Sequence, residues 1–188
     1  MAAIPNNGNR KRDLRIALSL RGKAAAVYKA LTSARELCYW WLQGAETDAK
    51  NGGRFRMVWP KIGNARSHAA KERGFFPPQA AAGEGQGTFV DLEPGRKVSW
   101  LWRLSAYKRR RLPALTSFVI APAGRGSCEL TLLHKGFSGS PEAQETFRRC
   151  ELWWGDCLAK LKLYLETGKV RKTEFLFLDA PKAAAKKR

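Results

Sequence analysis

The sequence predicts an α+β domain in which a curved antiparallel sheet wraps around one long C-terminal helix. Three observations predict this fold. Apolar and polar residues alternate in several short segments separated by Gly- and Pro-rich turns, as expected of half-buried antiparallel strands. The segment 141–167 carries a continuous apolar stripe at helical spacing. This helix is the only predicted element large enough to cover the apolar face of the sheet, and the interior between them can stay partly hollow.

The first strand is predicted at 12–20, where leucine or isoleucine occupies every second position from residue 14. Two short helices follow, one at 23–31 and one that begins at Ser33. Ser33 and Glu36 have the spacing of a capping box, in which each side chain satisfies a backbone donor at the start of a helix.

The middle of the chain is predicted to form the remaining strands. Their expected ranges are 54–59, 87–92, 97–104, 115–121 and 128–134. A long connection is expected at 61–86. The run Gly83-Glu84-Gly85-Gln86-Gly87 has the composition of a phosphate-binding loop, but it lacks the required spacing and precedes a strand rather than a helix, so we reject that function.

The last helix has clear end signals, with Ser140 as N-cap, Pro141 at the first helical position and Gly168 as C-cap. Its apolar stripe consists of Phe147, Cys150, Trp154, Cys157, Leu158, Leu161 and Leu165. We therefore predict a basic, flexible N-terminus at 1–11, a domain at 12–168 and a partly disordered basic extension at 169–188. In that extension Phe175 and its neighbours could add a strand or dock on the surface.

The chain is strongly basic, with 35 Lys and Arg against 16 Asp and Glu and a net charge of +19 among 188 residues. Such a charge suits an anionic partner, and a solvated basic surface is the alternative. The candidate anion-binding residues are Lys108, Arg109, Arg110 and Arg111, which follow Tyr107. No nucleic-acid-binding motif accompanies them. We expect nonspecific binding to polyanions that is lost near physiological salt.

The four cysteines form no CxxC pair, and the chain has only two histidines, so no metal site is predicted. We expect the cysteines to be small buried hydrophobes in a reducing compartment. The sequence has no apolar run long enough for a signal peptide or a membrane span, which favours a cytoplasmic protein. No cofactor and no catalytic residue is predicted.

Aromatic and other apolar residues fall on the predicted inward faces and form either a solid core or the lining of a ligand cavity. The candidate cavity residues are Trp41, Phe55, Met57, Trp59, Phe89, Trp100, Trp102, Phe118, Leu132, His134, Trp154 and Leu158. His134 is either a hydrogen-bonded structural residue, a polar group at the cavity mouth, or a general acid or base.

Five segments, in order, resemble the SRPBCC superfamily, and the closest group is that of the activator-of-heat-shock-protein-90-ATPase homologues. They are Val27–Thr32 with Trp40-Trp41, Gly52–Phe55, Gly87–Pro94, Leu130–Phe137, and Trp154-Gly155 with Leu158, Leu161 and Lys162. In the last segment the Trp and Gly are reversed relative to the family pattern.

The resemblance implies the helix-grip, or START-like, fold, whose members hold hydrophobic ligands between the sheet and the long helix. We therefore expect a non-catalytic module that binds a hydrophobic or lipid-like small molecule. Three alternatives remain: a co-chaperone-like protein-interaction domain with a role in stress response, a cyclase- or hydrolase-like enzyme, and a polyanion or nucleic-acid binder.

Overall fold

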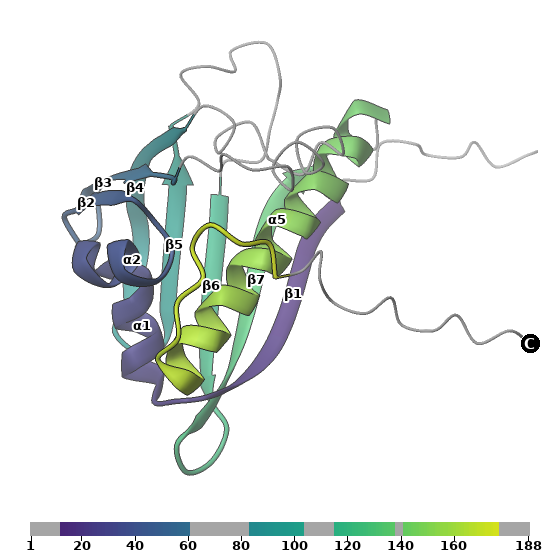
Figure 1. Ribbon diagram of the computed structural model, residues 1–188. Coiled ribbons are helices and arrows are strands. Elements are labelled where there is room, and N and C mark those ends of the chain that lie inside the picture. Colours follow the sequence, from purple (N-terminus) through teal and green to yellow (C-terminus); the bar gives the residue numbers. More distant parts are fainter. Residues whose placement is uncertain (1–11, 61–82, 104–114, 138–140, 177–188) are drawn as a thin grey trace, which may run out of the picture.

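The computed structural model describes residues 12–60, 83–103, 115–137 and 141–176, and it confirms the predicted α+β helix-grip architecture. Figure 1 shows the elements in their chain order. They are β1 (Arg12–Arg21), α1 (Ala24–Thr32), α2 (Ala34–Trp40), β2 (Gly44–Thr47), β3 (Arg54–Val58), β4 (Glu84–Glu93), β5 (Lys97–Trp102), β6 (Leu115–Pro122), β7 (Ser127–Phe137) and α5 (Pro141–Thr167).

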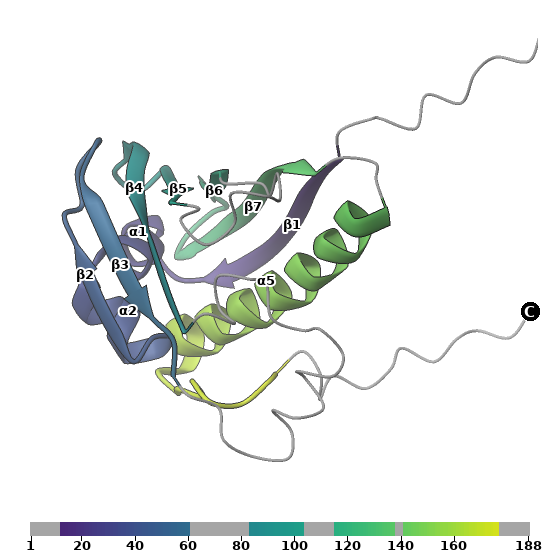
Figure 2. The ribbon, with the colours of Figure 1, turned by 90° about the horizontal axis from the view of Figure 1, so that it is seen from above.

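The seven strands form one antiparallel sheet in the order β1-β7-β6-β5-β4-β3-β2. From β2 to β7 each strand pairs with the next one in sequence, and β1 pairs with β7 at the far edge. Viewed from above, the sheet curves, and α5 lies along its open side with α1 and α2 at one end (Figure 2). The two outermost strands are therefore β1 and β2.

The register of the sheet places large apolar side chains side by side on the face toward α5. In neighbouring strands Phe118 pairs with both Val98 and Leu132, and Leu132 pairs with Ile16. A one-residue shift would turn these side chains to the other face, so their burial specifies the register. The core between sheet and helix is thus continuous across the central strands.

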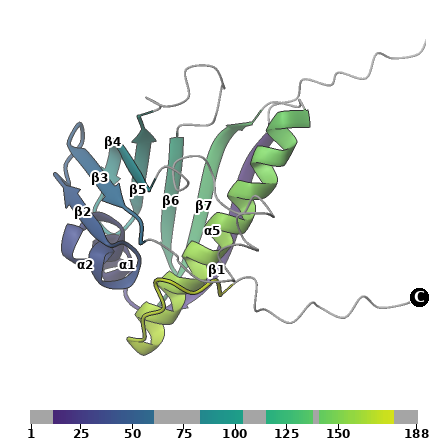
Figure 3. The same ribbon diagram turned by 45° about the horizontal axis from the view of Figure 1, so that its top comes forward.

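Helix α5 has the predicted bounds, and the members of its stripe are buried or partly buried in the core. Gly168 follows it with a positive φ of 71°, which ends the helix as predicted. Figure 3 shows α5 crossing the sheet on the side of β1. The predicted N-cap, Ser140, lies outside the described residues.

The capping-box prediction is wrong, although helix α2 itself is present. Ser33 makes no side-chain capping hydrogen bond. Instead, the hydroxyl of Thr47, on β2, accepts a hydrogen bond from the Ala34 backbone N–H at 3.1 Å. Glu36 is bound by Tyr164 and Lys29. The cap is supplied from a distant strand because α2 packs against it.

Two other differences concern strands. The short edge strand β2 was not predicted, because four residues with a mixed burial pattern carry little alternation. Strand β4 begins at Glu84, inside the predicted connection 61–86.

Within the part of the chain that the structure describes, no helix is long and apolar enough to cross a membrane.

Candidate ligand-binding site

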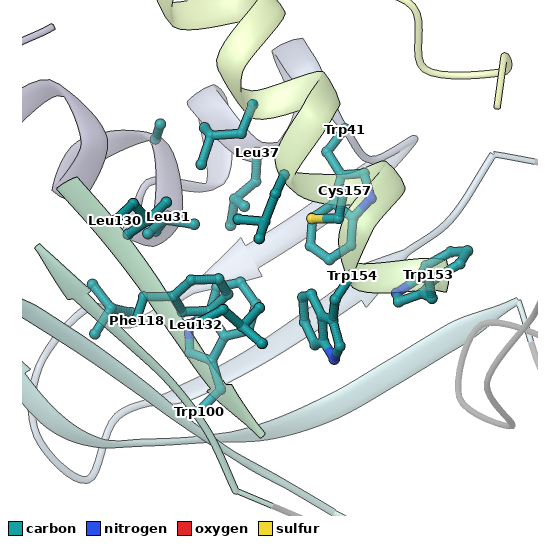
Figure 4. Packing of buried hydrophobic residues seen from close by; sticks show 14 of the residues in the cluster. Leu31, Leu37, Trp41, Trp100, Phe118, Leu130, Leu132, Trp153, Trp154 and Cys157 are labelled. Atoms are coloured by element: carbon teal, nitrogen blue, oxygen red, sulfur yellow. The ribbon is translucent and has the colours of Figure 1, made fainter. Parts of the chain in front are cut away.

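All twelve candidate cavity residues are buried, and the structure brings them together between the sheet and α5. Trp41 comes from the end of α2, Trp154 and Leu158 from α5, and the others from β3 to β7 or, for Trp59, from the residue after β3. Figure 4 shows Trp154 directed from α5 toward Phe118 and Leu132 on the sheet. Ligand binding by these residues stays a prediction.

All seven tryptophans of the chain join one network of ring contacts, which we call the tryptophan cluster. Trp41 is at its centre, with ring centroids 5.4 to 6.3 Å from those of five others. Trp102 joins through Trp59 at 6.2 Å and Trp100 at 5.7 Å. The cluster consists of Trp40, Trp41, Trp59, Trp100, Trp102, Trp153 and Trp154.

Two members of the cluster, Trp40 and Trp153, were absent from the predicted site. Each is half of a Trp-Trp pair, and a helix normally turns consecutive residues to different sides. Both are buried nevertheless, and the indole N–H of Trp40 donates to the Ala30 carbonyl at 3.0 Å. The two consecutive Trp-Trp pairs in the sequence were the signal that could have added Trp40 and Trp153 to the predicted site.

Aromatic rings of this region pack closely against the backbone of β4 at two glycines, Gly85 and Gly87. A Cβ atom on Gly85 would lie 2.8 Å from the ring of Trp59 and 3.0 Å from that of Trp102. A Cβ on Gly87 would overlap both the Phe55 ring and the Leu101 carbonyl oxygen. The alternating glycines, which the sequence analysis rejected as a phosphate loop, therefore allow aromatic rings to approach the backbone of β4 closely.

We expect Gly87→Ala to lower the free energy of unfolding by about 2 kcal/mol, because the added methyl group overpacks this contact and the Leu101 carbonyl cannot move independently. Chemical denaturation followed by circular dichroism measures the change. Gly22→Ala is the control, since a Cβ there meets no atom within 4 Å. Equal stability of Gly87→Ala and the wild type would contradict the proposed close contact.

A chain of hydrogen bonds crosses the cluster on the β6–β7 side. The indole N–H of Trp102 donates to the Thr116 hydroxyl at 3.2 Å, and the Thr116 oxygen is 2.6 Å from Nδ1 of His134. The indole N–H of Trp154 also donates to Nδ1 of His134, at 3.2 Å. Since an indole can only donate, Nδ1 is unprotonated and accepts. This bonding is expected if His134 is a hydrogen-bonded structural residue, the first of the three roles considered for it.

The indole nitrogens of Trp59 and Trp100 differ from those of Trp40, Trp102 and Trp154. Both are buried, and neither has a hydrogen-bond partner among the described residues. An unpaired buried donor costs about 1–3 kcal/mol. The cluster thus contains two hydrogen-bond donors that the described part of the protein does not use.

A buried ion pair on α5, which the sequence did not reveal, lies beside the cluster. Lys160 Nζ is 2.6 Å from Asp156 Oδ2, with side-chain exposures of 5% and 3%. Lys160 lies in the second half of α5, and its side chain is buried rather than exposed to solvent. The available signal was the i,i+4 spacing of opposite charges directly beside the apolar stripe.

The ion pair anchors the segment 169–176, which we call the C-terminal clasp. Figure 1 shows the chain turning back along α5 after Thr167. The Leu176 N–H donates to Asp156 Oδ1 at 2.7 Å, and Lys160 Nζ donates to the Lys172 carbonyl at 3.3 Å. Phe175 is buried, with its ring centroid 5.5 Å from Lys160 Nζ. Of the two predicted alternatives, this segment docks rather than adding a strand.

The clasp also holds the end of α2, from which Trp41 enters the cluster. Lys172 Nζ donates to the Cys38 carbonyl at 2.7 Å and to the Leu42 carbonyl at 3.2 Å. These carbonyls lie at the negative end of the helix, where a cation is favoured. The position of Trp41 is therefore tied to α5 through the clasp.

A second link between α2 and α5 is the hydrogen bond that Tyr164 Oη donates to Glu36 Oε2, at 2.5 Å. This bond, followed by the Lys29 ammonium, lowers the pKa of Glu36, against an opposing effect of burial. The same bond, followed by burial, raises the pKa of Tyr164 to about 12.

We expect Tyr164→Phe to lower the free energy of unfolding by about 1–2 kcal/mol between pH 4.5 and 10, the ordinary pKa values of the two groups. Because the pKa of Glu36 is lowered on folding, this stabilisation is lost as the pH falls through its folded value. Because that of Tyr164 is raised, the stabilisation is also lost as the pH rises through about 12. Denaturation at several pH values measures it. Tyr39→Phe, which removes an exposed hydroxyl, is the control, and a pH-independent difference would contradict the prediction.

The candidate anion-binding residues Lys108, Arg109, Arg110 and Arg111 lie outside the described residues. A shallow surface cleft of about 420 Å³ is lined by Arg54, Arg56, Arg103 and the acidic Glu46 and Asp48. Arg56 already pairs there with Glu46, at 3.2 Å. Since its charges have mixed sign, this cleft does not replace the tryptophan cluster as the candidate site.

The four cysteines are free, and Cys128, Cys150 and Cys157 are buried. Burial raises the pKa of the Cys150 thiol to about 12 and that of Cys157 well above its ordinary value. Thiols with such raised pKa values are unreactive at neutral pH, as expected of structural residues.

Comparison with known proteins agrees with this geometry. The family model of the activator of Hsp90 ATPase homolog 1-like proteins matches residues 21–166, and no curated protein matches the chain. Many solved structures share the fold, and three of them are described below.

A protein of Mesorhizobium loti has a TM-score of 0.58 at 18% identity, with 82% of this chain and 96% of that one covered. A protein of Staphylococcus saprophyticus has a TM-score of 0.61 at 13% identity, covering 87% and 98%. The Aha1 dimer of Colwellia psychrerythraea has a TM-score of 0.57 at 18% identity, covering 84% and 98%. Since the family model spans most of the chain, the chain belongs to the activator of Hsp90 ATPase homolog 1-like family of SRPBCC proteins.

Proposed function

We propose that the protein is a non-catalytic binding module that takes a hydrophobic or lipid-like small molecule between the sheet and α5, at the tryptophan cluster. One observation carries the proposal: the cluster combines seven buried indoles with two buried N–H groups that lack an acceptor among the described residues. Aromatic walls with a few polar groups are typical of small-molecule sites. The fold is in general that of a ligand-binding or Aha1-like domain.

Binding rather than catalysis is favoured by the state of His134. Two donors, from Thr116 and Trp154, already point at its Nδ1 atom. A general base needs a free lone pair directed at the substrate. Use of Nδ1 as a general base would therefore first require this hydrogen-bonded chain to rearrange.

The proposal is tested by titrating the protein with a naphthalene-type dye while following tryptophan fluorescence. We expect saturable quenching in the wild type and its loss in Trp102→Ala. Leu101→Ala is the matched control, because Leu101 is the exposed neighbour of Trp102 in the same strand. Circular dichroism confirms that each variant is folded. Absence of saturable binding to the wild type would overturn the proposal.

A second candidate function is binding to a chaperone, which the family's description as activators of Hsp90 ATPase favours. The net charge of +19 would suit an acidic partner surface. The ATPase rate of purified Hsp90, measured with and without this protein, tests the idea. An unchanged rate at saturating protein would exclude activation.

A cytoplasmic location is part of the proposal. It is supported by the four free cysteines, since cysteines of secreted proteins are usually paired in disulfides.

A further inference from the structure

We infer that the ligand of the tryptophan cluster is a neutral apolar molecule bearing a carbonyl oxygen, which accepts hydrogen bonds from the indole N–H groups of Trp59 and Trp100. The inference rests on the proposed function and adds the chemistry that the site selects.

The two rings that carry these donors share two ring neighbours in the cluster, Trp41 and Trp102. The rings of Trp59 and Trp100 lie 6.1 and 6.3 Å from the ring of Trp41, between centroids. They also lie 6.2 and 5.7 Å from the ring of Trp102. The residue after β3 and strand β5 thus bring two indoles with unpaired N–H groups against the same two neighbouring rings. A carbonyl oxygen has two lone pairs and can accept from both.

The burial of these indoles makes the missing acceptors significant. Trp100 is fully buried and Trp59 is 6% exposed, and in both the nitrogen itself is shielded from solvent. Buried donors of native proteins are nearly always paired with protein or ordered water. Three other indoles of the cluster follow this rule, since Trp40, Trp102 and Trp154 each donate to a protein acceptor. This rule calls for an acceptor that the described residues do not supply at Trp59 and Trp100, and we assign that role to the ligand.

The surroundings of the two donors favour an uncharged ligand. Among the residues that the structure describes, the ring contacts of Trp59 are with Trp41, Trp102 and Trp153. Those of Trp100 are with Trp41, Phe55, Trp102, Phe118 and Trp154. Transfer of an ion into such an environment is very costly, whereas a carbonyl group loses little once it is hydrogen-bonded. Flat apolar rings would stack on the same walls.

The test compares acetylnaphthalene with ethylnaphthalene, which have similar shapes but differ in the carbonyl oxygen. Each is titrated into the full-length protein with tryptophan fluorescence as the readout. We expect the ketone to bind roughly 5- to 150-fold more tightly, as two net hydrogen bonds would give. The infrared carbonyl band of the bound ketone should shift to lower frequency, and the indole N–H NMR signals of Trp59 and Trp100 should move downfield.

Trp59→Phe and Trp100→Phe each remove one donor while keeping an aromatic ring. Each should reduce the preference for the ketone and leave the affinity for ethylnaphthalene within about 2-fold, since only one hydrogen bond is lost. Trp41→Phe is the control, because the Trp41 indole is not one of the two buried unpaired donors. It should leave the ratio of the two affinities, and so the preference for the ketone, unchanged.

The outcomes separate the inference from the proposed function. Equal binding of the two naphthalenes by the wild type, with no infrared shift, overturns the inference and leaves the binding module in place. A ketone preference that survives in both Trp→Phe variants also overturns the inference. The same holds if the indole N–H NMR signals of Trp59 and Trp100 indicate bound water and do not change when the ketone is added. Binding of neither naphthalene, together with absence of dye binding, overturns both.

Discussion

Replacing Asp156 with alanine is expected to lower the free energy of unfolding by about 3–5 kcal/mol, because the substitution leaves the Lys160 ammonium buried without its counter-ion. The two side chains are 3% and 5% exposed, and their charged atoms are 2.6 Å apart. The substitution also removes the acceptor of the Leu176 N–H. Urea denaturation followed by far-UV circular dichroism measures the loss.

The matched control is Glu145→Ala, which removes a carboxylate paired with Arg148 and Arg149 on the surface of the same helix. Exposed pairs contribute about 1 kcal/mol or less, so this variant should remain close to the wild type. In the double variant Asp156→Leu with Lys160→Met, the loss should be smaller than the sum of the single losses, since no charge is left buried. Additive losses, or a small effect of Asp156→Ala alone, would show that the pair is not buried in solution.

Asp156→Ala should also loosen the C-terminal clasp. Asp156 and Lys160 hold the backbone at Leu176 and Lys172, and Lys172 in turn holds the end of α2. Hydrogen exchange should therefore accelerate at residues 169–176 and at the end of α2 before it does so in the central strands. Faster exchange spread evenly over the domain would point instead to general destabilisation.

Trp41→Ala is expected to lower the free energy of unfolding by about 3–5 kcal/mol, the usual cost of truncating a large buried aromatic residue. Trp41 is 3% exposed and contacts five other tryptophan rings, so its removal leaves a cavity that the neighbouring rings cannot fill without losing their own contacts. Tryptophan emission should shift to longer wavelength as water reaches the remaining indoles.

Tyr39→Ala is the control for this substitution, since Tyr39 is an aromatic residue of the same helix that is 56% exposed. It should cost about 1 kcal/mol or less. A Trp41→Ala protein as stable as Tyr39→Ala would mean that Trp41 is not at the centre of a packed cluster.

Much of the fold could be predicted because its signals are local. The two-residue alternation in β1, β3 and β5, and the stripe and end signals of α5, depend only on neighbours within a few residues. The inward faces of the sheet follow from the same alternation, so the twelve candidate cavity residues were correctly expected to be buried. The order of these elements was enough to predict a sheet wrapped around one helix.

What the tertiary structure decided was the partner of each polar group. The first N–H of α2 is capped by Thr47 rather than Ser33, Glu36 binds Tyr164, and Lys160 is buried with Asp156 beneath the clasp. The indoles of Trp59 and Trp100 remain unpaired among the described residues although others in the same cluster find acceptors. Hydrogen bonds and ion pairs require atoms within about 3–4 Å, and residues far apart in the chain reach that distance only when elements pack. Periodicity in the sequence specifies which face of an element is buried, whereas the atoms that meet a buried donor are specified only by the packing of the whole chain.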